Sequence, residues 1–269
     1  QRKRVFFVFL SMLLLSGLGA GSWSTPTPAA AHERDVDDVS DFYEPLEAHG
    51  TWITMEEYGR VWIPRGVSQD WRPYNSDGRW VYTEVGSTWV SDYEWGWAPF
   101  HYGRWSRSPR HGWFWIPGTV WGPGWVNWRR TPGWVGWAPL PPSVGFNVGI
   151  GLGVGHISVN IAPDWFSFVE ERHILQPRVS RYSVSRARNP RLVQVTNNVT
   201  NYVVINNRVV NQSIHVENIE RVTKRKVVVN RIVEVDSVEK ARGPKVRDKE
   251  REGVLLRPAS IKRRGTDEA

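Results

Sequence analysis

The chain has 269 residues, with 17 tryptophans, no cysteine and a formal net charge of +8. Without cysteine, a disulfide framework, a thiolate zinc site and a cysteine nucleophile are all excluded. The charge is segregated, because residues 32–100 carry a net −9, whereas residues 101–140 hold five arginines and no carboxylate. Residues 141–269 carry a net +9, which suits attraction to an acidic segment or to an anionic partner.

The N-terminal residues 1–31 have the layout of an export signal. Residues 2–4 are all basic, residues 5–18 form an apolar stretch, and residues 29–31 match a small-residue cleavage pattern. The apolar stretch is shorter than the ~20 residues that a membrane-spanning helix needs. We therefore expect a signal peptide and an exported protein of the periplasm or cell envelope, with no transmembrane helix after signal removal. A cut before Trp23 and an uncleaved N-terminal anchor remain as alternatives.

An acidic leader, residues 32–48, follows the predicted signal peptide. It contains Asp35, Asp37, Asp38 and Asp41 and ends near the pair Phe42-Tyr43. Its charge predicts a loose segment, and its aromatic pair predicts an anchor on the region that follows.

Residues 51–142 hold 15 of the 17 tryptophans and show a tandem repeat. Equivalent tryptophans recur 25 to 28 residues apart, which is the length of one small supersecondary unit. Three registers recur, represented by Trp52, Trp80 and Trp105, then Trp62, Trp89 and Trp115, then Trp71, Trp97 and Trp125.

The composition of each unit favours short antiparallel strands. Aromatic and β-branched residues, which prefer strands, alternate with turn sequences such as residues 75–78 and 108–112. We therefore predict a mainly β fold, in which residues 49–142 form tandem antiparallel β-meander repeats of two or three strands. A single unit could not bury its rings alone, so the repeats are expected to stack through their tryptophans, with Trp137 closing a fourth, partial unit.

A smaller β-rich region with at most a short helix is predicted for residues 143–235. Glycines alternate through residues 144–159, and a Val/Asn-rich stretch follows with Asn197-Asn198 and Asn206-Asn207 as turns. Residues 216–226 have the spacing of a short helix. Charged residues dominate residues 236–269, which predicts a basic, disordered tail.

The spacing of the tryptophan motifs resembles that of the domain-of-unknown-function family 6600, a group of exported bacterial proteins. The resemblance covers roughly residues 42–142 and rests on sequences such as Trp95-Gly96-Trp97-Ala98-Pro99 and Gly133-Trp134-Val135-Gly136-Trp137-Ala138-Pro139. It implies export and a tryptophan-rich architecture but brings no activity, cofactor or ligand. Some members carry a FecR-type segment, which this sequence lacks, so no regulatory role is implied.

The aromatic and arginine residues that cluster in the middle of the repeat region form the candidate binding face. Trp95 and Trp97, and likewise Trp113 and Trp115, would share a face if they lie on strands. Such rings could stack on a glycan, another envelope polymer or a protein partner. The candidate ligand-binding residues are Trp95, Trp97, Tyr102, Arg104, Trp113, Trp115 and Trp121. The competing interpretation places most of the tryptophans in a core between repeats.

Three further hypotheses concern the charges. Arginines between aromatic rings are also typical of single-strand nucleic-acid grooves, but the export signal argues against nucleic acid. The basic rear half is expected to contact an anionic surface, or alternatively to associate with the acidic front of the chain.

Evidence for catalysis is weak in the sequence. Glu84, Asp92 and Glu94 could supply a carboxylate pair of a polysaccharide- or peptidoglycan-acting hydrolase, which is the alternative function. The histidines lack metal-ligand spacing, and no catalytic residues, metal or cofactor are predicted. The sequence therefore favours a non-enzymatic, envelope-associated structural or interaction protein.

Overall fold

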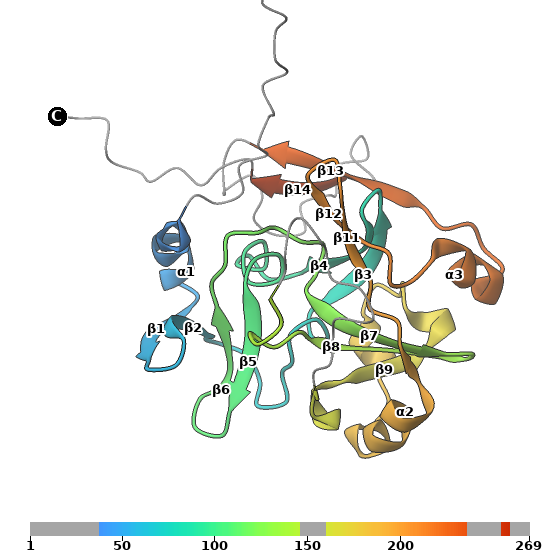
Figure 1. Cartoon of the computed structure of the whole chain (residues 1–269), viewed down its shortest axis with the longest axis horizontal. Helices are drawn as coiled ribbons and strands as arrows, with labels where there is room; N and C mark the ends of the chain where they lie inside the picture. The colour runs from blue at the N-terminus through green and yellow to red at the C-terminus, as the bar shows by residue number, and fades with distance from the viewer. Residues whose placement is uncertain (1–37, 146–159, 236–253, 259–269) are drawn as a thin grey trace, which may run out of the picture. The chain divides into compact units, whose positions relative to one another are not determined.

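The computed structural model describes residues 38–145 and 160–235, together with the backbone of residues 254–258. All of them belong to one compact unit, residues 33–269. The fold is mainly β, as predicted, and its described strands form three sheets (Figure 1). The predicted signal peptide and most of the glycine-alternating stretch lie outside the described residues.

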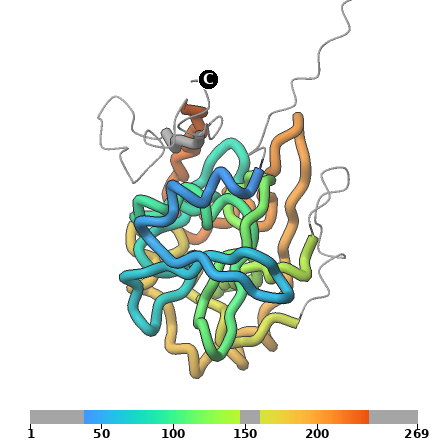
Figure 2. The backbone as a smooth tube through the Cα atoms, turned by 90° about the vertical axis from the view of Figure 1, so that its left-hand side faces the viewer, coloured from blue at the N-terminus to red at the C-terminus, as the bar shows by residue number. Residues whose placement is uncertain are grey.

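The leader is helical where the structure describes it and is anchored by its aromatic pair. It forms the 3-10 turn η1 (Val39–Phe42) and the short helix α1 (Tyr43–Glu47), and the Asp38 carboxylate accepts a hydrogen bond from the Ser40 amide. Phe42 is fully buried, and Tyr43 packs edge-on against Trp52 at a centroid distance of 4.7 Å. Figure 2 looks onto this side, with the leader in blue in front of the repeat strands.

Each repeat unit is a two-stranded antiparallel hairpin. The four hairpins are β1 (Gly50–Met55) with β2 (Gly59–Pro64), β3 (Gly78–Thr83) with β4 (Gly86–Ser91), β5 (Arg104–Ser108) with β6 (Gly112–Ile116), and β7 (Val126–Thr131) with β8 (Trp134–Pro139). Two tryptophans face each other across every hairpin. These pairs are Trp52–Trp62, Trp80–Trp89, Trp105–Trp115 and Trp128–Trp137. The fourth unit is therefore a complete hairpin and not the partial one that the sequence predicts.

The glycine that opens the first two repeats makes room for a tryptophan of the opposite strand. A Cβ atom on Gly50 would lie 2.2 Å from the Trp62 ring, and one on Gly78 would lie 2.4 Å from the Trp89 ring. Both distances are below van der Waals contact. The recurring Gly-x-Trp motif is thus explained by packing, because the indole covers the backbone at the start of the partner strand.

The hairpins pack in alternation and not in a row. The first and third share a sheet of order β1-β2-β6-β5, joined where Trp62 pairs with Trp115. The second and fourth meet through their rings, with Trp80 and Trp128 centroids 4.6 Å apart. Stacking through tryptophans is therefore confirmed. Trp71, Trp97 and Trp125, the third register, lie in the loops between hairpins and are buried.

The rear region completes the repeat sheets, so the two regions fold as one unit. Its helical segments are η3 (Pro163–Trp165), η4 (Glu171–His173), η5 (Val179–Tyr182), η6 (Arg186–Arg188), α2 (Asn189–Val195) and α3 (Val216–Thr223). Its strands are β9 (Ser167–Glu170), β10 (Asn197–Asn198), β11 (Tyr202–Ile205), β12 (Arg208–Asn211), β13 (Val229–Val235) and β14 (Val254–Pro258). They give the sheet orders β10-β7-β8-β9 and β11-β12-β4-β3-β13-β14.

Three features of the rear region differ from the sequence-based expectation. It has two short α-helices, α2 and α3, where at most one was expected, because α2 has a proline in its first turn and buries only Asn189 and Leu192. The predicted basic tail contributes β14, which pairs in parallel with β13 from Arg231 to Val235 (Figure 1). The Asn206-Asn207 turn is confirmed, with positive φ at both residues. The turn predicted at Asn197-Asn198 is wrong, because these residues form β10 and pair with β7.

Buried polar side chains clamp the rear region onto the fourth hairpin. The Tyr202 hydroxyl donates to the Gly124 carbonyl at 2.5 Å and accepts from the Val126 amide at 3.1 Å. Thr200 accepts hydrogen bonds from the Trp128 amide at 2.7 Å and from the Asn127 side chain at 3.0 Å. Buried backbone groups need such partners, so these contacts fix the position of β11 against β7.

Candidate functional site

The rings predicted to form a binding face are buried instead. Exposed fractions do not exceed 9% for any of the six aromatic residues, Trp95, Trp97, Tyr102, Trp113, Trp115 and Trp121. A platform for stacking on a polymer must present a ring face to solvent, and these residues do not. The expectation of an exposed aromatic face on them is therefore corrected, and the competing core interpretation describes their packing.

The leader is one reason for this burial. The Phe42 ring lies 5.9 Å from Trp97, 5.3 Å from Tyr102 and 5.1 Å from Trp115. Trp95 and Trp97 do not share a strand face either, since they lie in the turns that follow β4. Trp95 instead stacks between Tyr93 and Phe100 at 4.4 and 5.5 Å.

Arg104 and Trp121 lie beside the loop that leads to the fourth hairpin. The Arg104 guanidinium sits 4.1 Å above the Trp125 ring and donates to the Gly103 carbonyl. Burial lowers the pKa of Arg104 to about 10, so the side chain stays charged at neutral pH. Trp121 stacks in parallel on His101 at 5.3 Å. The cation–π contact accounts for an arginine among the rings, and the stack on His101 accounts for the packing of Trp121.

Trp113 lines a cleft that we call the tryptophan cleft. This tryptophan cleft, of about 330 Å³, lies between the loop after β2 and the β5–β6 turn and is also lined by Trp71, Arg107 and His111. Trp113 packs edge-on against Trp165 at 4.8 Å. Little of either ring is accessible from the cleft, because Trp71 is 3% and Trp113 9% exposed.

A larger cleft lies between β3, the segment after η4 and the α3–β13 connection; we call it the basic cleft. Its volume is about 870 Å³, within the range of ligand sites. Its cationic lining residues are Arg79, Arg172, Arg225 and Lys226, and no carboxylate is among the residues that line it. Tyr82, Leu175, Val222 and Val228 provide apolar wall.

Three of these four cations, Arg79, Arg172 and Lys226, form ion pairs with carboxylates that lie outside the lining. Arg79 lies 3.5 Å from Asp92, and Arg172 lies 2.7 Å from Glu170. Both pairs are solvent-exposed, so their attraction is screened and weak. Arg225 has no ion-pair partner among the residues that the structure describes.

Glu220 ties the last turn of α3 to the segment before β13. Its carboxylate accepts hydrogen bonds from the Val227 amide at 3.0 Å and from Lys226 Nζ at 2.9 Å. The backbone hydrogen bond from Val227, followed by that from Lys226, lowers the pKa of Glu220. The helix ends at Lys224, which adopts the left-handed conformation. One wall of the basic cleft is thus set by a local polar contact.

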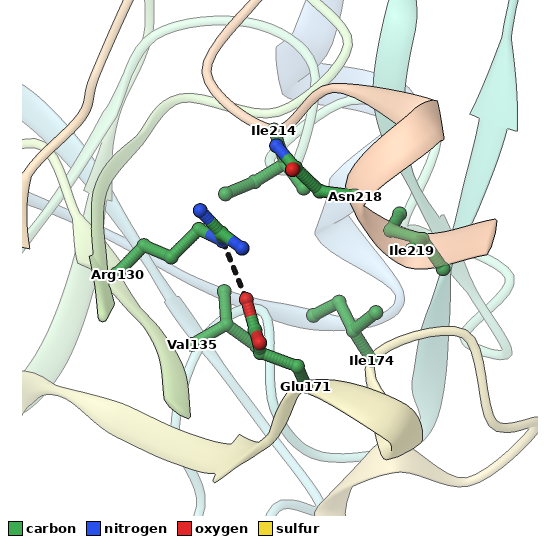
Figure 3. A pocket seen from close by; sticks show the side chains of 7 residues that line it. All are labelled: Arg130, Val135, Glu171, Ile174, Ile214, Asn218 and Ile219. Carbon is green, nitrogen blue, oxygen red and sulfur yellow. Dashed lines mark hydrogen bonds and ion pairs between the residues drawn. The ribbon is translucent and has the colours of Figure 1, made fainter. Parts of the chain in front are cut away.

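A partly buried ion pair lies beside α3, as Figure 3 shows. Arg130 Nε donates to Glu171 Oε1 at 2.5 Å, and Glu171 Oε2 accepts from the Gly133 amide at 3.0 Å. The walls around the pair are Val135, Ile174, Ile214, Asn218 and Ile219, and the space that remains is about 10 Å³. That space holds no more than about one water. The pair therefore joins β7 to the segment after β9 and offers no room for a substrate.

The carboxylates considered for hydrolysis do not come together in a cleft. Glu84 accepts a hydrogen bond from the Ile232 amide and lies 3.5 Å from Arg208, and Asp92 pairs with Arg79. Glu94 is exposed. Within the described ranges, no three metal-ligating side chains gather, and no helix there is long and apolar enough to cross a membrane.

Sequence reasoning missed the basic cleft because its residues come from three distant segments. Arg79 belongs to a repeat strand, Arg172 to η4, and Arg225 to the end of α3. The signal in the sequence was the net positive charge of residues 141–269. It predicted an anionic partner but not the position of the binding site.

Comparison with known proteins identifies one domain. Residues 43–144, the leader's end and the four hairpins, match the family model described as a family of unknown function (DUF6600). The search of curated proteins and that of solved structures gave no match. The family therefore covers the repeat region, while most of the basic cleft lies in the rear region that the match does not reach.

Proposed function

From the premise that residues 43–144 belong to the family of unknown function DUF6600, we propose that the protein is an exported, non-enzymatic, envelope-associated interaction protein. Its tryptophan hairpins form a rigid scaffold, and its basic cleft binds an anionic polymer or protein partner. The observation that carries the proposal is the cleft itself, about 870 Å³, lined by Arg79, Arg172, Arg225 and Lys226 without a carboxylate.

Charge and compartment both support this proposal. Like charges around a concave surface raise the local concentration of an oppositely charged ligand. Export is supported by the basic start, apolar stretch and cleavage pattern of residues 1–31. Polymers of the bacterial envelope include acidic glycans and acidic protein segments, and either would be available to a protein in this compartment.

Binding is tested by titrating the exported protein with polyglutamate and with alginate, using neutral dextran as the control ligand. We expect both polyanions to bind, more weakly as salt rises, and dextran not to bind. Arg225→Glu is expected to weaken binding about fivefold, the effect of a ~1 kcal/mol charge contact. Arg110→Glu is the matched control, because Arg110 is exposed and lines neither cleft. Equal binding of dextran, or equal losses in both variants, would contradict the proposal.

Export is tested separately by producing the chain with its own N-terminal segment in bacterial cells and separating the fractions. The protein is expected in the periplasmic or envelope fraction. Replacing residues 2–4 by acidic residues is expected to retain it in the cytoplasm, since the positive start is part of the signal. Cytoplasmic location of the unaltered chain would contradict the export proposal while leaving the binding result unaffected.

A further inference from the structure

The turn of the first hairpin carries two exposed carboxylates. Strands β1 and β2 pair as far as Met55 and Gly59, so Glu56, Glu57 and Tyr58 form the turn between them; we call these three residues the acidic tip. Both glutamates are exposed, and the Tyr58 hydroxyl makes a hydrogen bond to Glu57 that raises the pKa of Tyr58. No ion pair among the described residues involves either glutamate. The acidic tip therefore presents two negative charges to solvent.

The turns of the other three hairpins do not have this chemistry. The β3–β4 turn has one carboxylate, Glu84, which accepts a hydrogen bond from the Ile232 amide and lies 3.5 Å from Arg208. The β5–β6 turn carries a cation, Arg110, and the β7–β8 turn is the uncharged pair Pro132-Gly133. Within the repeat region, an acidic turn without an ion pair is thus particular to the first hairpin.

The surroundings of the acidic tip and of the basic cleft have opposite charge. Residues 38–65 contain six carboxylates and two arginines. Both arginines are held locally, because Arg60 lies 4.0 Å above the Tyr43 ring and Arg65 donates to the Glu47 carbonyl. Residues 172–231 contain 12 basic and two acidic residues. Complementary potentials of this kind bring two surfaces together and orient them.

Exposed valines beside the basic cleft favour a protein as the guest. Val228, which lines the cleft, is 72% exposed, and Val229 is 54% exposed. Neighbouring exposed apolar residues at a cleft are typical of a protein contact. A fitting guest therefore combines carboxylates with apolar groups. The acidic tip does so, since the partly exposed side chains of Met55 and Tyr58 flank its two glutamates.

The acidic tip does not enter the cleft of its own chain. No residue of the leader or of the first hairpin is among the residues that line the cleft, and Figure 1 shows β1 and β2 on the opposite side of the fold from α3. A tip in the cleft would therefore come from a second copy. Because tip and cleft are different surfaces, a copy whose tip is docked keeps its own cleft open for the next copy, which is a heterologous contact.

We propose that the basic cleft binds the acidic tip of a second copy of this chain, so that the protein associates head to tail. The inference rests on the proposed function and specifies its protein partner. The two tip glutamates lie against the cleft cations, among which Arg225 has no ion-pair partner in the described part of the chain. Repetition of this contact gives closed rings or open chains of copies.

The test follows the average molar mass of the full exported protein by light scattering as its concentration rises. We expect the mass to rise with concentration at low salt and to rise less at high salt, because salt screens the attraction. Glu56→Lys and Arg225→Glu are each expected to weaken association about fivefold, the effect of a ~1 kcal/mol charge contact. The matched controls Glu94→Lys and Arg110→Glu make the same changes at exposed residues outside the tip and the cleft and should leave association unchanged.

Mixing the two variants tests the head-to-tail arrangement. The Glu56→Lys chain keeps an unaltered cleft, and the Arg225→Glu chain keeps an unaltered tip, so a mixture contains one fully native contact. We expect the equimolar mixture to associate about fivefold more tightly than either variant alone. It should form pairs in preference to longer assemblies, since the remaining tip and cleft of each pair are altered. A mixture that associates no more tightly than its components would overturn the proposal.

Further outcomes separate this inference from the proposed function. If polyglutamate binds but the protein stays monomeric at low salt, self-association is overturned and the proposed function stands. If the variants and their matched controls lose association equally, net charge drives the association and the inference is again overturned. If the protein neither associates nor binds polyglutamate, both proposals are overturned.

Discussion

The repeat region and the rear region use β-strands in opposite ways. In the repeat region every strand finds its partner in the neighbouring strand of the same hairpin, and facing tryptophans fill the interior. In the rear region β9, β10, β12 and β13 pair with strands of the repeats that lie far away in the sequence. The repeats therefore build the core, whereas the rear strands close sheet edges and bring cations to the surface.

This difference bears on the proposed binding site. A tryptophan that contacts several other rings in a core cannot readily be substituted to fit a ligand, because the substitution would disturb the packing. The residues that line the basic cleft come from both regions, and the segments from η4 and from α3 to β13 belong to the rear region. A shared scaffold with a variable rear region would allow related chains to bind different partners.

The largest effect on stability is expected from removing a central tryptophan of the repeat region. Trp80 is fully buried and lies within 6 Å of the rings of Trp89, Trp128 and Trp137. Trp80→Ala is expected to lower the free energy of unfolding by about 3–5 kcal/mol, measured by urea denaturation. Trp165→Ala, at a partly exposed tryptophan of the rear region, should cost clearly less. Equal losses would show that the repeat rings have no special role in the core.

The partly buried pair of Arg130 and Glu171 tests how firmly the rear region is held. Glu171→Gln leaves Arg130 without its countercharge in a largely apolar surrounding, and we expect a loss of about 3 kcal/mol in unfolding free energy. Replacing both Arg130 and Glu171 by methionine should recover much of this loss, because apolar groups then fill the site. The control is Glu170→Gln in the exposed pair with Arg172, where less than about 1 kcal/mol is expected. A double variant as unstable as Glu171→Gln would contradict this account.

The Tyr202 clamp is expected to contribute less. Tyr202→Phe removes the acceptor of the buried Val126 amide and the donor to Gly124, so a loss of about 1–3 kcal/mol is expected. Tyr182→Phe is the control, since Tyr182 is 41% exposed. Stability is measured by urea denaturation, and equal midpoints for the two variants would contradict a stabilising role of the Tyr202 hydroxyl.

The smallest effect concerns pH. The pKa of Glu220 is lowered in the folded protein, so its stabilising contact is fully present above the unfolded-state pKa of about 4.3 and is lost as pH falls through the lower folded value. The melting temperature should therefore fall slightly less on acidification in Glu220→Gln than in the unaltered protein. Glu217→Gln, on the same helix, serves as the control and should behave like the unaltered protein.

Much of the scaffold could be predicted from the sequence, because its cause is local. Gly-x-Trp motifs, turn residues and the 25–28-residue spacing predict hairpins whose rings stack. The fourth hairpin was underestimated because its first tryptophan, Trp128, follows Trp105 after only 23 residues and thus falls outside the main register.

The site could not be predicted, because its position depends on long-range pairing. Nothing near Arg79 in the sequence indicates that η4 and the end of α3 will lie beside it. The burial of Trp97 also depends on Phe42, a leader residue that packs against it, and that of Trp95 depends on Tyr93 and Phe100, which stack on its ring. The sequence shows which aromatic residues are regularly spaced. Their exposure depends on residues from distant parts of the chain that pack over them.

The central claim is that the tryptophan hairpins are a scaffold and the basic cleft is the binding site. Hydrogen exchange of the full exported protein, with and without saturating polyglutamate, tests it most directly. The account predicts added protection in β3, in residues 172–177 and in residues 219–230, with no change in the β5–β6 hairpin that borders the tryptophan cleft. Protection centred on β5, β6 and Trp113, with none beside α3, would contradict it.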